Sequence, residues 1–357
     1  MEVVLFVPGF FGFAAFGGAD RPLVEYFARV EAAMLRARQD LRFEVHDPPP
    51  AGSLQARAQS LHARVSRLIA DGVQKLHLIG HSSGGVDARL LVNARYAGLP
   101  DRTALAAKVT SVITISAPLR GTPLARRIGR GAWLAAPVLW FASILASRGR
   151  LRLAGVAATL FNLLKRATLQ APTPTDDLIA QLAGVDRDTA AQIREFLRGV
   201  AGDHLLIHDL TPEAMSALNR EVEGGDHAGL SSFVSVSPAA GLSPLAFATA
   251  PLQRMFYDLS WTLTSSAPRD GGTVPRGPWI DGGRQALTER SNDGIVPAWS
   301  QTLDGRATGI VLGDHLDVIG HYEAMGATFL RSGSRFDEAR FDALWTEIAN
   351  TLPPPRD

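Results

Sequence analysis

In residues 75–97, an apolar run is followed directly by a glycine-rich turn and then by a helical pattern. Lys75–Ile79 has the character of a buried strand, and a helix is expected from about Ser83 to Ala97. Between them lies the sequence Gly80-His81-Ser82-Ser83-Gly84-Gly85. A strand that leads through a short turn directly into a helix is typical of parallel sheets covered by helices. The stretch therefore favours the α/β class.

Strand and helix patterns alternate along both ends of the chain. Further strands are predicted at Val3–Val7, Arg42–His46, Val109–Ile115, Phe233–Val236 and Gly309–Leu312. Further helices are predicted at 20–34, at 53–70 and from Thr211 onward. The alternation predicts a mostly parallel central sheet with helices on both faces. Residues 266–294, which are rich in Gly and Pro, are expected to form loops.

The regular alternation stops in the middle of the chain. Residues 120–175 contain nine Arg or Lys and no Asp or Glu, and they include two long apolar patches. We expect a helical insertion at 120–225 that divides one α/β domain into two parts, 1–119 and 226–357. Its longest uncharged stretch, Gly131–Ser147, has 17 residues. That length is below the roughly 18 to 20 residues that span a bilayer.

Composition excludes several classes of function. A net charge of +1 does not supply the basic field that nucleic-acid binding requires, so nucleic acid is not expected as a partner. The absence of cysteine excludes disulfide and thiolate chemistry. An acidic residue follows Met1, and Pro8-Gly9 interrupts the first apolar run, which is unlike a secretory signal. We therefore expect a cytoplasmic or membrane-surface protein, or a secreted one whose signal was removed before residue 1.

The turn after residue 79 has the spacing of a nucleophile elbow, Gly-x-Ser-x-Gly. Gly80 and Gly84 lie two positions on either side of Ser82, whereas Ser83 would have His81 and Gly85 in those places. Small residues are needed because the turn is tight, and the helix that follows favours developing negative charge. Ser82 is therefore the predicted nucleophile, rather than part of a merely flexible turn.

A serine hydroxyl needs a base to remove its proton, and an acid that orients the base. Of nine histidines, His315 follows a predicted strand directly and so lies in a loop at the carboxyl end of the sheet. His321, six residues later, is expected to pack in the next helix or face solvent. His315 is therefore the predicted base.

The predicted acid is Asp293, in Ser291-Asn292-Asp293-Gly294-Ile295. It precedes His315 by 22 residues and follows Ser82, which gives the chain order Ser, Asp, His. Asp293 could instead form only an Asx turn. Asp281 is the competing acid, and Asp314 is disfavoured because it is adjacent to His315.

An oxyanion hole needs two backbone N–H donors. One is expected from Ser83, the residue after the nucleophile. The other is expected from the loop after the first strand, Val7-Pro8-Gly9-Phe10-Phe11-Gly12, with Phe10 as the donor.

Together these segments resemble bacterial true lipases, the triacylglycerol lipases of pseudomonads and their relatives, which have the α/β-hydrolase fold. The segments that carry the resemblance, in the family's order, are 4–10, 79–85, Ile115-Ser116-Ala117-Pro118-Leu119-Arg120-Gly121-Thr122, 210–213, 292–296 and His315-Leu316-Asp317. The resemblance implies the same triad of Ser82, Asp293 and His315. This chain has Pro8-Gly9 where the family usually has His-Gly, its lack of cysteine excludes the family's frequent disulfide, and we do not expect a signal peptide within it.

The family also binds a structural calcium near the catalytic histidine, and Asp317 matches one carboxylate ligand. The second ligand is open among Asp258, Asp270 and Asp281, and Asp317 could instead cap the following helix. No cofactor is expected for the chemistry itself.

The sequence thus predicts a carboxylic ester hydrolase of lipase or esterase type acting on an ester or lipid. The basic, apolar segment 120–175 would be a lid that contacts a lipid surface, or would be buried against the core or a partner subunit. The same triad would also serve a thioesterase, an acyltransferase or a polyester depolymerase. A non-catalytic lipid-binding module is the alternative from another class.

Overall fold

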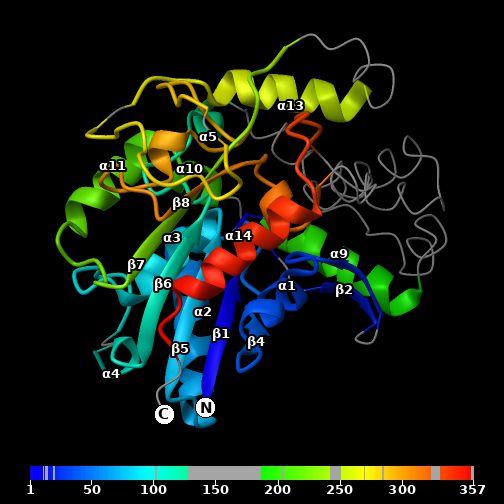
Figure 1. Ribbon diagram of the computed structural model, residues 1–357. Coiled ribbons are helices and arrows are strands. Elements are labelled where there is room, and N and C mark those ends of the chain that lie inside the picture. Colours follow the sequence, from blue (N-terminus) through cyan, green and yellow to red (C-terminus); the bar gives the residue numbers. More distant parts are fainter. Residues whose placement is uncertain are drawn as a thin grey trace.

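The chain forms a parallel six-stranded sheet with helices on its faces (Figure 1). The computed structural model describes residues 1–10, 12, 15–18, 21–100, 103–127, 186–202, 205–241, 251–268, 270–283, 285–322 and 330–354. In sheet order, the strands are β4 (Arg42–Val45), β1 (Glu2–Val7), β5 (Lys75–His81), β6 (Val109–Ile115), β7 (Leu230–Val236) and β8 (Gly309–Leu312). Every neighbouring pair is parallel, as the sequence predicts.

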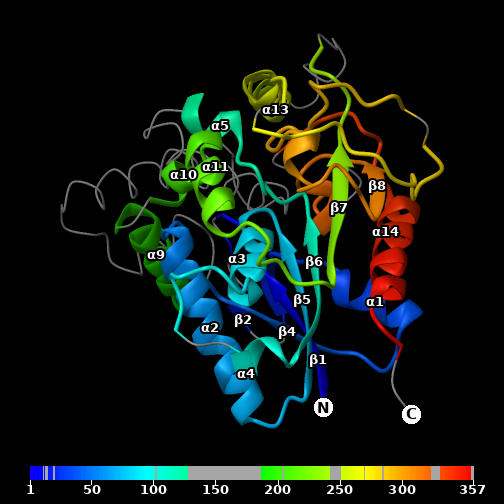
Figure 2. The same cartoon turned by 90° about the vertical axis from the view of Figure 1, so that its left-hand side faces the viewer.

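Helices cover both faces of this sheet. In Figure 2, α2 and α3 lie on one side of the strands, and α1 and α14 lie on the other. The described helices are α1 (Val30–Ala37), α2 (Leu54–Ala70), α3 (Ser83–Val92), α4 (Thr103–Ala106), α5 (Pro123–Arg127), α9 (Arg187–Gly202), α10 (Leu205–Asp209), α11 (Pro212–Glu221), α13 (Pro251–Thr264) and α14 (Glu338–Thr351), with 3₁₀ turns η1 (Ala298–Ser300) and η2 (Asp317–Ile319).

The helix ends follow from local chemistry. The side chain of Ser53 caps α2 by accepting the N–H of Ala56 at 3.2 Å, and Thr211 caps α11 in the same way. Pro212 then occupies the first turn of α11, where its missing N–H leaves no donor unpaired within the helix. These starts agree with the sequence prediction.

The helix predicted at 20–34 is wrong. Arg21–Glu25 forms strand β3, which pairs antiparallel with β2 (Ala15–Gly18), and α1 begins at Val30. Arg29 has a left-handed φ of 63°, which separates this hairpin from the helix. Tyr26 and Phe27 are buried here in irregular chain, so their apolar spacing reflects tertiary packing rather than a helical face. The helix after the glycine-rich turn also ends earlier than expected, at Val92.

The predicted lid falls mainly on residues 128–185, which lie outside the described residues. Its flanks are described: α5 precedes this segment, and α9, α10 and α11 follow it. Within the described residues, no helix combines the length and apolar character needed to cross a bilayer. Residues 270–283 and 285–294 contain no helix or longer strand, as their composition predicts.

Candidate active site

Ser82 lies in a strained turn between β5 and α3. It has φ 56° and ψ −134°, a conformation that non-glycine residues rarely adopt. A Cβ atom on Gly80 would lie 2.4 Å from the carbonyl oxygen of Gly84, and one on Gly84 would lie 2.0 Å from that of Val7. The turn can close only because both flanking positions are glycine, which is the reason that the sequence motif requires them.

Asp293 and His315 meet at the same end of the sheet. The Nδ1 atom of His315 lies 2.8 Å from Oδ2 of Asp293, and the main-chain N–H of His315 donates to the carbonyl of Asp293 at 3.0 Å. Because a carboxylate accepts, Nδ1 of His315 carries the proton and Nε2 is the basic nitrogen of the neutral ring. The His315 ring also lies 4.7 Å, between centroids, from that of His81, which immediately precedes Ser82.

The carboxylate of Asp293 is fully buried and held on both oxygens. Its Oδ1 accepts the N–H groups of Ile295 at 2.9 Å and Val296 at 2.7 Å, which forms the Asx turn considered from the sequence. Its Oδ2 accepts the hydroxyl of Ser235 at 2.9 Å as well as the His315 ring. Asp293 therefore makes the turn and holds the histidine at once, through different oxygens.

The loop after β1 lies directly against Ser82. A Cβ on Gly9 would be 2.5 Å from the Cβ of Ser82, so the Gly9 backbone approaches Ser82 as closely as packing allows. Phe10, the next residue, is half-buried, and Ser83 is fully buried at the start of α3. Phe10 and Ser83 are the residues predicted to supply the oxyanion-hole amides. Phe10 follows Gly9, which lies against Ser82, and Ser83 follows Ser82 in the chain.

A chain of buried hydrogen bonds joins this loop to the His315 loop. The N–H of Gly9 donates to the Tyr26 hydroxyl at 2.9 Å, and that oxygen lies 2.8 Å from Nδ1 of His81. Nε2 of His81 lies 2.9 Å from the carbonyl oxygen of His315. A carbonyl can only accept, so Nε2 of His81 is protonated and donates to it.

The protonation state of His81 fixes the direction of the other bond. Burial lowers the pKa of His81 well below its usual value, and the neighbouring His315 lowers it further. The ring is therefore neutral, Nδ1 accepts, and the Tyr26 hydroxyl donates to it. Tyr26 and His81 together connect the three segments that carry Gly9, Ser82 and His315.

A buried ion pair supports the same loop from the other side. Arg57 on α2 and Asp87 on α3 are both buried, and Nη2 of Arg57 lies 2.7 Å from Oδ2 of Asp87. The same guanidinium donates to the carbonyl of Pro8 at 2.7 Å, one residue before Gly9. The pair therefore links α3 to the loop that carries Phe10.

The other candidates from the sequence lie elsewhere. Asp281 pairs with Arg340 at 3.4 Å, and its Oδ1 accepts the N–H of Gly283 within its own turn. His321 is buried, and its Nε2 donates to the carbonyl of Tyr26 at 3.0 Å. Asp314 is buried beside the Asp293 carboxylate, and burial raises its pKa to about 7.

Asp317, the candidate calcium ligand, is engaged by protein donors. Its Oδ2 accepts the N–H of Asp314 and the hydroxyl of Ser334, each at 2.8 Å, rather than capping the turn that follows it. Over the part of the chain that the structure describes, no three acidic or histidine side chains gather where they could hold a metal ion. Structural calcium remains a prediction, and no step below depends on it.

Four residues that support the candidate site were not predicted from the sequence: Tyr26, Arg57, Asp87 and Ser235. Each acts through a partner at least 30 residues away, so no local motif marks it. The available signal was weak: Arg57 and Asp87 are charged residues that lie among buried apolar residues of α2 and α3.

Comparisons with known proteins agree with this architecture. The sequence matches no protein-family model and no curated protein. Among solved structures, EstA from Clostridium botulinum is similar over 98% of this chain and 87% of its own, with 16% identity and a TM-score of 0.55. The lipase of Staphylococcus hyicus is similar over 98% of this chain and 94% of its own, with 15% identity and a TM-score of 0.51. The chain has the α/β-hydrolase fold.

Proposed function

We propose that the protein is a serine hydrolase that cleaves carboxylic esters, with Ser82 as nucleophile, His315 as base and Asp293 as the acid that orients it. The observation that carries the proposal is the 2.8 Å contact between His315 and Asp293 beside the strained turn of Ser82. The similarity to a protein named as a lipase is consistent with it.

The first half of the reaction forms an acyl-enzyme. The Ser82 oxygen attacks the ester carbonyl while Nε2 of His315 takes its proton, and Asp293 stabilises the imidazolium that results. The amides of Phe10 and Ser83 donate to the oxyanion, and each such donor contributes about 3 to 4 kcal/mol to transition-state stabilisation. His315 then protonates the leaving alcohol.

The second half releases the acid. Water replaces the alcohol, His315 removes a proton from it, and the resulting hydroxide attacks the acyl-Ser82 carbonyl. Collapse of this second tetrahedral intermediate frees the carboxylic acid and returns the proton to Ser82. The nucleophile, the base, the acid and the oxyanion donors of this reaction are all residues of the chain.

Within ester hydrolases, we favour a lipase or carboxylesterase of the true-lipase kind. The basis is the set of sequence segments shared with that family and the apolar, basic segment 120–175. A thioesterase, acyltransferase or polyester depolymerase would use the same three residues.

Substrate profiling separates these functions. Nitrophenyl esters of increasing acyl length and matched acyl-thioesters should be compared in wild type and Ser82→Ala, with and without a lipid interface and a chelator. We expect ester hydrolysis that disappears in Ser82→Ala and rises at the interface. Hydrolysis of thioesters alone would replace the lipase proposal with a thioesterase.

A further inference from the structure

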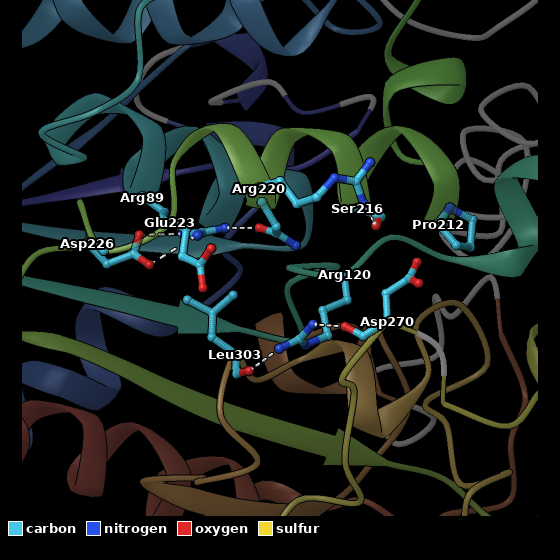
Figure 3. A pocket seen from close by; sticks show the side chains of 11 residues that line it. Arg89, Arg120, Pro212, Ser216, Arg220, Glu223, Asp226, Asp270 and Leu303 are labelled. Carbon is cyan, nitrogen blue, oxygen red and sulfur yellow. Dashed lines mark hydrogen bonds and ion pairs between the residues drawn. The ribbon is translucent and has the colours of Figure 1, made fainter.

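A polar cavity of about 420 Å³ lies away from the candidate active site (Figure 3). One wall is α11 and the turn after it, and the others come from the end of α3 and from the loops at residues 120, 270 and 303. Its charged lining residues are Arg89, Arg120, Arg220, Glu223, Asp226 and Asp270. None of Phe10, Ser82, Asp293 and His315 lines it.

Arg120 is the half-buried cation of this cavity. Its Nη1 donates to the carbonyl of Asp270 at 2.6 Å, and its Nη2 donates to that of Leu303 (Figure 3). These are neutral acceptors, and within the described residues no carboxylate forms an ion pair with Arg120. Its Nε is buried and has no hydrogen-bond partner there.

The charges around Arg120 are mixed. Burial lowers the pKa of Arg120 and the charge of Arg89 lowers it further, whereas the nearby carboxylates of Asp270 and Asp304 raise it. Arg89 is itself neutralised, because its Nε and Nη2 donate to the two carboxylate oxygens of Asp226 at 2.6 and 3.0 Å. The Asp226 carboxylate is therefore paired with Arg89 rather than with Arg120.

Arg220 adds a second cation at the rim of the cavity. Its Nη1 donates to the hydroxyl of Ser216 at 2.7 Å, and no ion pair to it occurs among the described residues. The two remaining carboxylates, Glu223 and Asp270, are on exposed residues, where water can solvate them. Arg120, with a buried and unpaired Nε, has no comparable access to solvent.

We propose that this cavity binds a small anion, a carboxylate or phosphate group, with the guanidinium of Arg120 as its main contact and Arg220 as a second cation. Arg120 keeps its positive charge while its hydrogen bonds go to carbonyl oxygens, and a guanidinium binds both groups through charge-assisted hydrogen bonds. The side chains of Leu303 and Pro212 offer apolar contact to the organic part of such a ligand. The site is separate from the ester site, so the proposal does not depend on the proposed hydrolase function.

Calorimetric titration tests the site. Sodium phosphate and sodium acetate are titrated separately into wild type, Arg120→Gln, Arg220→Gln and Arg276→Gln at constant ionic strength. Arg276 is exposed, lines a different cavity and serves as the matched control for loss of one positive charge. Circular dichroism and thermal unfolding establish that each variant is folded.

We expect one-to-one binding of at least one of the two anions to wild type. The dissociation constant should rise at least about tenfold in Arg120→Gln, the loss expected for a hydrogen bond to a charged group. It should rise to a smaller extent in Arg220→Gln and not at all in Arg276→Gln. Binding of phosphate alone or acetate alone would identify which group the cavity takes.

The proposal is overturned if neither anion binds wild type, or if folded Arg120→Gln binds as well as wild type. It is also overturned if Arg276→Gln weakens binding as much as the cavity variants do, because that would indicate a general charge effect. If Arg120→Gln does not fold, unchanged binding by Arg220→Gln overturns it.

Discussion

Replacing Tyr26 by Phe removes one oxygen atom from the chain of hydrogen bonds between Gly9 and His315. The aromatic ring and its packing remain. What is lost is the acceptor for the Gly9 N–H, at 2.9 Å, and the donor to Nδ1 of His81, at 2.8 Å. The substitution therefore removes only the hydrogen-bonded link between the loop that carries Gly9 and Phe10 and the turn that carries Ser82.

The size of the effect follows from the two groups left unpaired. An unsatisfied buried polar group costs about 1 to 3 kcal/mol, so the free energy of unfolding should fall by about 2 to 6 kcal/mol. Complete loss of an oxyanion donor lowers kcat by about 10²- to 10³-fold. In Tyr26→Phe the Phe10 amide is still present, but the loop that positions it is held less firmly. We therefore expect kcat to fall about tenfold with little change in KM.

Urea unfolding and nitrophenyl-ester kinetics measure these two effects. Tyr322→Phe is the matched control, because the Tyr322 hydroxyl accepts from Arg29 at 2.9 Å and takes no part in the chain of hydrogen bonds that joins Gly9 to His315. It should lose some stability and keep the kcat of wild type. A wild-type kcat in folded Tyr26→Phe, or equal losses of kcat in both variants, would refute the role given to Tyr26.

Three further substitutions test the surroundings of the site. Arg57→Met should lower the free energy of unfolding by about 3 to 5 kcal/mol in urea titrations, because it leaves the Asp87 carboxyl, whose pKa burial already raises to about 6, buried without its hydrogen-bonded partner; a loss below 1 kcal/mol would contradict this. Ser235→Ala removes a donor to Asp293 and should lower kcat about tenfold with unchanged KM in ester kinetics, whereas an unchanged kcat would show that Ser235 does not position the acid. Burial lowers the pKa of His46 from 6.5 to about 3, so the unfolded chain binds the proton first and stability falls as pH drops below 6.5. In urea titrations at pH 4.5, the free energy of unfolding of His46→Phe should have fallen about 3 kcal/mol less from its neutral-pH value than that of wild type has. An equal fall in both proteins would contradict this.

The sequence was sufficient for the six strands of the parallel sheet and for the turn at Ser82, but not for the β2–β3 hairpin. Alternating apolar runs predict β1, β5, β6 and β8 closely because each is buried on both faces, which leaves a continuous apolar signature. The glycines at 80 and 84 are required because an added Cβ would lie 2.4 Å from the carbonyl oxygen of Gly84 and 2.0 Å from that of Val7, and the Gly-x-Ser-x-Gly motif marks both positions.

The sequence was insufficient where distant contacts decide local structure. Tyr26 was assigned to a helix by its apolar spacing, but its hydroxyl bonds to Gly9 and His81, which are 17 and 55 residues away. The left-handed φ of Arg29 has no marker in the sequence either. Asp293 was predicted from its turn, and its place against His315 depends on the packing of the loop that carries it.

Covalent labelling of the nucleophile tests the central proposal most directly. Folded wild-type protein should be treated with a fluorophosphonate, digested and analysed by mass spectrometry. We expect one adduct, on Ser82, which is absent in Ser82→Ala, retained in Ser83→Ala and formed far more slowly in His315→Asn. No adduct on folded wild type, an adduct on another serine, or full ester hydrolysis by Ser82→Ala would contradict the proposed mechanism.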